Sequence, residues 1–462
     1  MNESSLLHSD RLFPVEPQIR ELARALYQRV ANLPLISPHG HTDPAWFATN
    51  APFKDPASLF IIPDHYLLRM FYSQGIPLEI FYKEQPRIIW RLFCKYYYLF
   101  RGTPSRFWLD HAIYEVFKVD KPIQENNADY IFDHISQCLT QPEFLPRALF
   151  EKFNIEVLAT TESPTDLLLQ HQKIQQSGWS GRVITTFRPD PVVDPDYENF
   201  LINIQQLGDI TKQDVGNYQG YLAALRDRRH YFKKFGATAT DHGHPSARTV
   251  NLAPLEAAAL YERVLLQRNS AQEAELFRAQ MLTEMAKMSL DDGLVMQIHP
   301  GSFRNHNSML FKRYGRDKGA DIPMPTDYVH ALKPLLDLVG NEKNLTIIIF
   351  TLDESTYSRE LAPLIGHYSV LKLGPPWWFL DSVDGIRRYL RTVTETTGFY
   401  NLAGFNDDTR GFVSIPARHD MSRRIEAGFL AELVCEHRLT EAEAHELIVD
   451  LAGAFAKKSY KL

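Results

Sequence analysis

Eight short apolar runs recur along this chain of 462 residues, and stretches with helical spacing separate most of them. Apolar runs of this length that alternate with helices are typical of buried parallel strands joined by helical crossovers. Eight such units in one chain predict an α/β fold, a (β/α)8 barrel, although the fourth run is weaker than the others. The runs lie at 33–41, 155–163, 181–190, 236–245, 294–301, 345–355, 369–378 and 401–410.

The long interval between the first two runs predicts a helical insertion. Residues 44–150 lack a convincing strand, are rich in aromatic residues, Leu and Arg, and are interrupted by frequent prolines. We therefore divide the chain into three parts. Residues 1–43 hold an N-terminal helix and the first barrel strand, residues 44–150 the insertion, and residues 151–462 the remainder of the barrel with a C-terminal helix.

Composition limits the class of protein. The net charge of −6 comes from interspersed acidic and basic residues, and no basic stripe suggests nucleic acid as a partner. The largest aromatic patch, at 95–100, is far too short to span a membrane, and the N-terminal segment carries no export signal. Three widely spaced cysteines (Cys94, Cys138 and Cys435) argue against a disulfide framework. We therefore expect a cytoplasmic protein.

Most of the predicted strands end in polar, titratable residues. In a barrel the carboxyl ends of all strands meet at one mouth, so these side chains converge. A binding module or a scaffold needs no such residue at nearly every strand, and this pattern favours an enzyme. The residues at the strand ends are His39, His41, Arg188, Asp190, Asp241, His242, His244, His299, Arg304, Asn305, Asp353, Glu354, Asp407, Asp408 and Arg410.

A His-x-His pair, His39 and His41, closes the first apolar run. Positions i and i+2 of a strand point to the same face, so both imidazoles can reach one divalent metal. Random placement of 17 histidines gives fewer than one such pair on average, and this chain has a second pair at His242 and His244. The position of His39 and His41 at a strand end therefore counts for more than their spacing.

Several longer segments resemble one enzyme family, the glucuronate (uronate) isomerases of the amidohydrolase superfamily. They run in the family's order, and the resemblance spans residues 12–462. It implies a distorted (β/α)8 barrel of the metal-dependent hydrolase type. The segments are ISPHGHTDP, PDHYLLRM, TTFRPD, DDGLVMQIHPGSFRNHN, GPPWWF and FNDDTRGFVSIPARHD.

The resemblance implies an aldose–ketose isomerase that acts on a small hexuronate. Such an enzyme interconverts D-glucuronate and D-fructuronate, and D-galacturonate and D-tagaturonate, by moving a proton between C2 and C1 through a cis-enediol. The reaction needs a base, a group that stabilises the developing oxyanion, and a grip on the distal carboxylate. We expect neither nucleic acid nor a membrane as partner. We expect a homo-oligomer, with aromatic-rich helices at 80–120 covering an interface.

By the same resemblance, His39, His41 and Asp408 hold one divalent metal ion, Zn²⁺ or alternatively Mn²⁺. Hydrolases of the wider superfamily commonly hold two metals, using a Lys or Glu on the fourth strand and a His on the sixth. Here the fourth run, ATDHGH, offers neither Lys nor Glu, and the sixth, IIIFTLDES, has no His. The missing bridging ligand favours a single metal ion.

The resemblance also implies the remaining roles. Tyr66 is the proton shuttle, Arg410 stabilises the phenolate and the enediolate, and Asp408 assists ring opening. If the two tryptophans lie in an extended segment, they face opposite ways and one of them walls the pocket. The expected substrate-binding residues are His65, Arg69, Arg188, His299, Arg304, Trp377 and Trp378.

Two adjacent carboxylates, Asp407 and Asp408, follow the last apolar run. If a strand continues through 405–410, the two side chains point to opposite faces, and only one can face the mouth. The resemblance selects Asp408, which then shares a face with Arg410. Asp407 would point toward the helices and act as a turn or capping residue.

Two other functions stay open at this point. The first is a mononuclear metal-dependent amidohydrolase that acts on a sugar-acid lactone or a related ester or amide, and produces no ketose. The second is a non-catalytic sugar-acid-binding protein, which would keep the arginines but would need no metal. The appearance of a ketose product distinguishes the isomerase from both.

Overall fold

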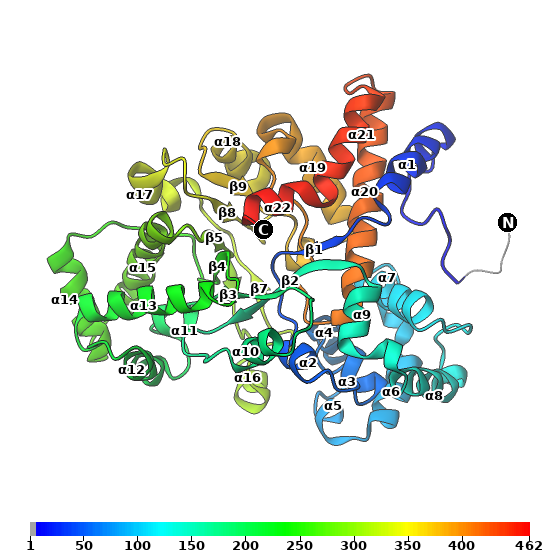
Figure 1. The fold of residues 1–462 in the computed structure, drawn as a ribbon, viewed down its shortest axis with the longest axis horizontal. Helices are drawn as coiled ribbons and strands as arrows, with labels where there is room; N and C mark the ends of the chain where they lie inside the picture. Colours follow the sequence, from blue (N-terminus) through cyan, green and yellow to red (C-terminus); the bar gives the residue numbers. More distant parts are fainter. Residues whose placement is uncertain (1–5) are drawn as a thin grey trace.

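The structure, a computed structural model, describes residues 6–462 of the chain. Seven parallel strands form one curled sheet in the order β1-β2-β3-β4-β5-β8-β9 (Figure 1). Each strand falls within one of the first seven apolar runs, which confirms those strand predictions, including the weak fourth one. The strands are β1 (Leu35–Ser37), β2 (Ile155–Glu162), β3 (Val183–Phe187), β4 (Ala239–His242), β5 (Val295–Ile298), β8 (Ile347–Ile349) and β9 (Leu371–Leu373).

The eighth apolar run fills the gap between β9 and β1. On one side, the Ala403 amide donates a hydrogen bond to the carbonyl of Leu373 in β9 (2.8 Å). On the other side, the His41 amide, just past β1, donates to the Thr409 carbonyl (3.0 Å). The sheet is therefore closed into a barrel by backbone contacts on both edges of this segment.

The eighth run is nevertheless not a regular strand, and the prediction of a strand through 405–410 is wrong. Two residues in the segment have positive φ angles, Gly404 at 85° and Asp408 at 34°. Such angles lie outside the extended region of the backbone, so the alternation of side chains between two faces is broken there.

Residues 44–150, all of which the structure describes, form helices and no strand. Several of these helices begin with a proline in the first turn, where its fixed φ angle suits a helix and its missing N–H costs nothing. The α-helices are α2 (Pro44–Thr49), α3 (Pro56–Phe60), α4 (His65–Ser73), α5 (Ile80–Lys83), α6 (Pro86–Lys95), α7 (Pro104–His111), α8 (Ala128–Leu139) and α9 (Pro146–Lys152). Their apolar cluster includes Leu35 and Ile155 from β1 and β2, so the helices pack directly on the barrel.

The other helices surround the sheet, and α1 lies along α20 and α21 (Figure 1). A short antiparallel hairpin, β6 (Ser302–Phe303) with β7 (Ile322–Pro323), follows β5. The surrounding helices are α1 (Pro17–Val30), α10 (Leu169–Gln176), α11 (Asp190–Val193), α12 (Phe200–Thr211), α13 (Tyr218–Lys233), α14 (Pro254–Leu265), α15 (Ala271–Asp292), α16 (Ser308–Tyr314), α17 (Val329–Val339), α18 (Ala362–Ile365), α19 (Val383–Thr397), α20 (Ile415–Cys435), α21 (Glu441–Val449) and α22 (Phe455–Tyr460).

The C-terminal helix α22 supports the floor of the barrel. The hydroxyl of its buried Tyr460 donates to Oε1 of Gln297 in β5 (3.0 Å). The amide nitrogen of Gln297 lies 3.4 Å from Nδ1 of His39. This chain of contacts supports the ring of His39 from below, and its Nε2 lies on the side of Asp408, at 3.7 Å.

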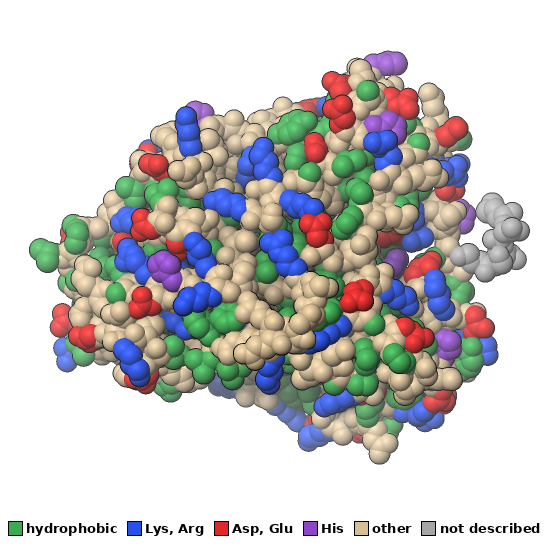
Figure 2. Space-filling model, in the orientation of Figure 1, with side chains coloured by type: hydrophobic (Ala, Val, Ile, Leu, Met, Phe, Trp, Pro, Cys, Tyr) green, Lys and Arg blue, Asp and Glu red, His purple; other side chains and the backbone are tan. Residues whose placement is uncertain are grey.

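The surface carries charges of both signs. On the face shown in Figure 2, Lys and Arg side chains are interspersed with Asp and Glu side chains. Within residues 6–462, no helix combines the length and the apolar character needed to cross a bilayer.

Candidate active site

A cavity of about 730 Å³ opens at the carboxyl ends of the strands, between the barrel and the helices of residues 44–150. Its volume lies within the ~300–1,000 Å³ range of small-molecule sites. All but one of the residues expected in the site line this cavity. They are His39, His41, His65, Tyr66, Arg188, His299, Arg304, Trp377, Trp378, Asp408 and Arg410.

Arg69 is the exception. It lies on α4, one turn beyond His65, and it is not among the residues that line the cavity. Its guanidinium stands over the ring of Phe379 at 4.8 Å from the ring centre. The structure therefore places Arg69 behind the cavity wall, and not beside a bound ligand.

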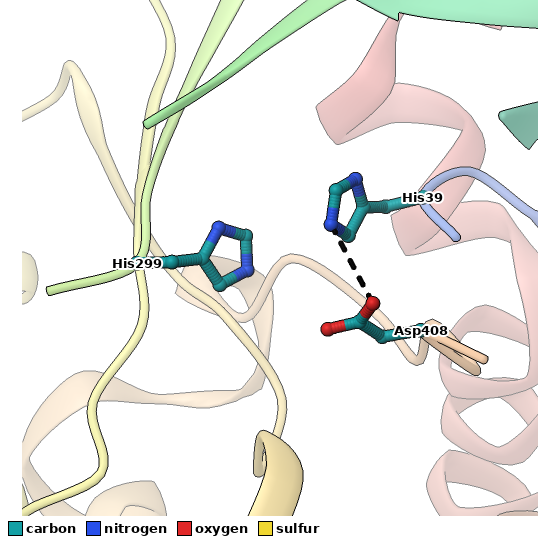
Figure 3. A group of neighbouring side chains, drawn as sticks. All are labelled: His39, His299 and Asp408. Carbon is teal, nitrogen blue, oxygen red and sulfur yellow. Dashed lines mark ion pairs between the residues drawn. The ribbon is translucent and has the colours of Figure 1, made fainter. Parts of the chain in front are cut away.

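Histidine and aspartate side chains converge at the bottom of the cavity. Oδ1 of Asp408 lies 3.3 Å from Nε2 of His41 and 3.7 Å from Nε2 of His39. The ring of His299, the residue after β5, stacks on that of His39 at 5.0 Å between centres. Figure 3 shows His39, His299 and Asp408 approaching from three separate segments of the chain toward one space.

Asp241, the residue before the end of β4, completes this cluster; the sequence placed it among the strand-end residues of the mouth but assigned it no role. Its Oδ1 accepts a hydrogen bond from Nδ1 of His299 (2.7 Å), and its Oδ2 lies 4.0 Å from Nε2 of His39. Arg188 donates to the same Oδ2 (2.9 Å). The alternation of side chains in a strand was the available signal for its role. His242 is the next residue in β4, and if one of the two faces the helices, the other faces the mouth.

The charges of the cluster suit a divalent cation. Burial lowers the pKa of His41 and of His299, so both imidazoles stay neutral and keep a lone pair. Burial opposes ionisation of Asp241, but Arg188 and His299 outweigh it and hold its pKa well below the usual range. Burial likewise opposes ionisation of Asp408, but His39 and His41 hold its pKa below the usual range.

One orphaned atom supports the same conclusion. Nε2 of His299 is buried and has no hydrogen-bond partner among the described residues. Because Nδ1 carries the proton given to Asp241, Nε2 holds a lone pair. Ligating histidines commonly show this arrangement, with a carboxylate on one nitrogen and the metal on the other. Two overlapping groups have ligand atoms close enough to share an ion: His39, His299 and Asp408, and His39, His41 and Asp241.

Tyr66 stands on the opposite wall, on the first turn of α4. The carboxylate of Asp64 caps this helix by accepting the amide of Tyr66 (2.8 Å) and that of Leu67 (3.3 Å). The phenol ring packs edge-on against Trp108, with 5.6 Å between centres. The helix start therefore determines where the Tyr66 hydroxyl lies.

A buried arginine that sequence reasoning missed lies beside Tyr66. The guanidinium carbon of Arg418, on α20, is 5.8 Å from the centre of the Tyr66 ring and 3.5 Å from that of Trp108. Arg418 donates to Oδ2 of Asp381 (2.5 Å). Burial raises the pKa of the Tyr66 hydroxyl, and Arg418 is the largest influence that opposes this rise. No local pattern marks Arg418 or Asp381, which are far apart in the sequence.

Arg410, expected beside Tyr66, has a different nearest partner. Its guanidinium pairs with Asp317 at 2.9 Å, and its side chain is 39% exposed. Arg410 therefore lies at the rim of the cavity, while Arg418 is the cation that faces the Tyr66 ring.

Both tryptophans border the cavity, contrary to the expectation that only one would. Trp377 packs on His299 with 4.7 Å between ring centres, and Trp378 packs on His65 with 5.4 Å. The alternation fails because Trp378 has a φ angle of 53° and starts a short 3-10 helix. The guanidinium of Arg304 lies 4.9 Å from the centre of the Trp378 ring.

The side chains of Asp407 and Asp408 point in different directions, as predicted, although residues 405–410 do not form the strand from which this was predicted. Oδ2 of Asp407 accepts from Nε2 of His419, on α20, at 3.1 Å, and Asp407 is almost wholly buried. Asp408 instead turns to the histidines of the mouth. The positive φ of Asp408 produces this divergence. Because Asp407 bonds to a buried histidine side chain, it serves neither as a turn residue nor as an exposed helix cap.

Comparisons with known proteins point to one family. The family described as Glucuronate isomerase matches residues 16–460. A uronate isomerase from Rhizorhabdus wittichii is 61% identical over 99% of this chain and 98% of its own length. The crystal structure of glucuronate isomerase from Caulobacter crescentus superposes with a TM-score of 0.98 at 56% identity, over 98% of this chain and 97% of that one.

A more distant structure agrees. A uronate isomerase from Thermotoga maritima superposes with a TM-score of 0.93 at 26% identity, over 99% of this chain and 100% of that one. These likenesses confirm the predicted fold class, an α/β fold with a curled parallel sheet. The match over nearly the whole chain shows that this protein belongs to the glucuronate isomerase family.

Proposed function

We propose that this protein interconverts D-glucuronate with D-fructuronate, and D-galacturonate with D-tagaturonate. The observation that carries the proposal is the convergence of His39, His41, Asp241, His299 and Asp408 below a cavity walled by Tyr66. The family match gives the reaction class, an aldose–ketose isomerisation. The alternative of a lactone-opening hydrolase has no comparable support.

One divalent ion is assigned to the mouth cluster. His39, His41 and Asp408 are its expected ligands, and Asp241 and His299 are close enough to complete or adjust the set. We expect Zn²⁺, with Mn²⁺ as the alternative, because neutral imidazoles and carboxylates suit both. Bound there, the ion would orient and polarise oxygen atoms of the sugar.

Tyr66 is assigned to the proton transfer. Its oxygen takes the proton from C2 of the open-chain aldose, and the electron pair moves through the new C1–C2 double bond to the oxygen on C1. The proton of the C2 hydroxyl passes to the oxygen on C1, and the proton held by Tyr66 returns at C1, which leaves the carbonyl of the ketose at C2. A phenolate base needs a nearby cation, because burial raises the pKa of the Tyr66 hydroxyl. Arg418 supplies that cation, and Asp381 holds it in place. Arg410, at the rim and paired with Asp317, is assigned to the stabilisation of the enediolate.

The distal carboxylate of the substrate is assigned to Arg304. The nearest acidic partner of Arg304 is Asp321, at 3.5 Å, which leaves its guanidinium free to turn toward a ligand. Arg188 is already committed to Asp190 and Asp241, at 2.9 Å each. We therefore expect Arg188 to contact sugar hydroxyls, together with His65 and the tryptophan pair. Asp408 is also assigned to ring opening.

The decisive experiment follows each uronate by NMR in D2O. The purified, metal-loaded protein should convert D-glucuronate and D-galacturonate to the corresponding ketoses, and the deuterium content at C1 measures how far the carried proton exchanges with solvent. The same samples should be supplied with the corresponding sugar-acid lactones. Lactone opening without any ketose from either uronate would replace the isomerase by the hydrolase, and binding without turnover would favour a sugar-acid-binding protein.

Two expectations about the setting belong to the same proposal. All three cysteines are free thiols, which suits the reducing cytoplasm. Tyr82, Ile88 and Tyr98, on the helices at 80–100, are 40%, 45% and 51% exposed. Exposed large apolar side chains in that region support a homo-oligomer, which light scattering of the purified protein would test.

A further inference from the structure

The second His-x-His pair lies in a buried cluster, called the sealed cluster below, that the reaction does not use; of its three members only Asp190 lines the cavity. His242 is the last residue of β4, and His244 lies two residues further along the chain. Asp190, at the start of α11, faces them from the segment after β3. Both histidines and Asp190 are buried, with 0%, 2% and 5% of their surfaces exposed. Ligand atoms of the three lie within 4.8 Å of one another.

His242 presents a lone pair to this cluster. Nε2 of His242 lies 3.0 Å from the hydroxyl oxygen of Thr240, so this nitrogen can donate its proton to that oxygen. A neutral imidazole with a proton on Nε2 has none on Nδ1. Nδ1 of His242 is buried and has no hydrogen-bond partner among the described residues.

His244 is more exceptional. Both of its ring nitrogens are buried, and neither has a hydrogen-bond partner within residues 6–462. Leaving buried polar atoms unpaired costs ~1–3 kcal/mol each, so such atoms call for a ligand. Nε2 of His244 lies 3.9 Å from Oδ1 of Asp190, too far for a hydrogen bond but close enough to share an ion.

The third group, Asp190, is a carboxylate held from its other side. Its Oδ2 accepts from Nε of Arg188 (2.9 Å), and the amide of Gly243 is shared between Oδ2 (3.1 Å) and Oδ1 (3.2 Å), while Oδ1 also faces His244. A side chain at position 243 would force Arg188 or Asp190 to move, because its Cβ would stand 2.2 Å from Nη2 of Arg188 and 2.9 Å from Oδ2 of Asp190. Gly243 therefore allows the carboxylate to reach the His-x-His pair.

We propose that Asp190, His242 and His244 bind a divalent cation, Zn²⁺, at a buried site separate from the mouth. Two imidazoles and one carboxylate form a donor set typical of zinc, whose bonds to nitrogen and oxygen are ~2.0–2.2 Å long. Tetrahedral ligand atoms then stand ~3.4 Å apart, so the 3.9 Å pair needs only a small side-chain rotation. The mouth keeps its own single ion, because the two clusters share no ligand.

The buried ion would have a positioning role. It would tie the segment after β3 to the end of β4, the two segments that carry Arg188 and Asp241. Arg188 contacts Asp190 of the sealed cluster and Asp241 of the mouth at 2.9 Å each. The ion would neutralise part of the charge of Asp190 and so weaken its attraction for Arg188. Arg188 would then be held mainly by Asp241 and by the substrate.

Zinc content of purified, zinc-saturated and desalted protein tests the proposal. The wild-type protein should hold about two equivalents per chain, and the His244→Ala variant about one. A double variant of the mouth, His39→Ala with His41→Ala, should also hold about one, and the combination of all three changes none. As a matched control, His171→Ala removes a buried histidine whose ring already bonds to Thr160 (2.9 Å), and this variant should keep both equivalents.

Cobalt gives an independent readout that needs no change in the sealed cluster. In the double variant of the mouth, Co²⁺ should produce the visible absorption of a four-coordinate N/O site, and Zn²⁺ should abolish it. A folded double variant that holds no zinc and gives no such absorption would overturn the proposal, as would His244→Ala protein with the zinc content of wild type. If instead the mouth binds no metal, wild type and double variant would both hold one equivalent, and only the metal assignment of the mouth would fail.

Discussion

The two His-x-His pairs of this barrel have the same spacing and opposite surroundings. At the mouth, the side chains of His41 and Asp408 are 22% and 14% exposed to a cavity, and two carboxylates face the imidazoles. In the sealed cluster, His242 and His244 are almost wholly buried, and one carboxylate, Asp190, faces them. Spacing can therefore provide ligands at either place, but only the mouth offers room for a substrate.

The difference comes from the face of the barrel wall that each pair occupies. His39 follows β1 and points inward, as does Asp241 in β4. His242 is the next residue after Asp241 and points the other way. The fourth strand thus contributes one residue to the reactive region and the next residue to the sealed cluster.

Asp408→Asn should produce the largest contrast between the two regions. The amide is a poorer metal ligand and cannot act as a base, so turnover of D-glucuronate should be abolished while the protein stays folded. The sealed cluster should keep its zinc, since it shares no ligand with the mouth. Assays of ketose formation and zinc content check this. Normal turnover in this variant would move the reactive centre away from Asp408.

Tyr66→Phe should remove catalysis without removing a metal from either region. General acid–base groups typically contribute ~10²–10⁴-fold, and kcat should fall by that factor. Zinc content and the melting temperature should stay near those of wild type, because only a hydroxyl is lost. A kcat within a few-fold of wild type would mean that another group, such as Asp408 or His299, moves the proton.

Arg418→Lys tests whether the buried cation beside Tyr66 belongs to the reactive region. Lysine keeps the charge but not the planar contact with Trp108 or the geometry of the pair with Asp381. We expect kcat to fall ~10-fold and KM to change much less, because Arg418 acts through Tyr66 and not on the bound sugar. A change confined to KM would instead place Arg418 in substrate binding.

The pH dependence should carry the signature of Asp381. Burial raises the pKa of Asp381 to about 7, and Arg418 offsets only part of that rise. As the pH falls below about 7, Asp381 takes up a proton, its pairing with Arg418 weakens, and kcat should decrease. The Asp381→Asn variant should have a lower kcat with a flatter acid limb, and an unchanged acid limb in this variant would assign the titration to another group.

The free energy of unfolding should change with pH in the opposite direction to kcat. The pKa of Asp381 in the folded protein, about 7, lies above the ordinary value of 3.8. Its neutral form therefore favours folding fully below pH 3.8, and this contribution is lost as the pH rises through 7. Thermal melts between these pH values should show a smaller decline for Asp381→Asn than for wild type.

The sequence predicted the strands and their polar ends well because those signals are local. An apolar run followed by His39 and His41 is visible in a few residues, and so are the ends of β3, β4 and β5. Arg418 and Asp381 meet only through the packing of α20 against the segment before α19, and no local pattern reports such a contact. Tyr66 was identified through family resemblance alone, since many tyrosines share its local setting.

The eighth run shows a different limit. Its apolar residues predicted a strand, but Gly404 and Asp408 adopt positive φ angles and break the two-residue alternation. The divergence of Asp407 and Asp408 was predicted correctly from an incorrect backbone. Two adjacent residues can diverge in a strand or at a left-handed residue, and the sequence pattern does not distinguish the two cases.

Asp407→Asn should have the smallest effect. Asp407 is buried and its neighbour Asp408 lines the cavity, so these two positions differ in the same way as the two His-x-His pairs. Asp407 bonds to Nε2 of His419 in a buried setting and does not line the cavity. The amide can still accept that hydrogen bond, so we expect a loss of ~1 kcal/mol in the free energy of unfolding and most of the turnover to remain. Denaturant unfolding and the ketose assay measure the two quantities on one preparation. Abolished turnover in a folded Asp407→Asn protein, with an active Asp408→Asn protein, would require the metal cluster to be rebuilt around Asp407.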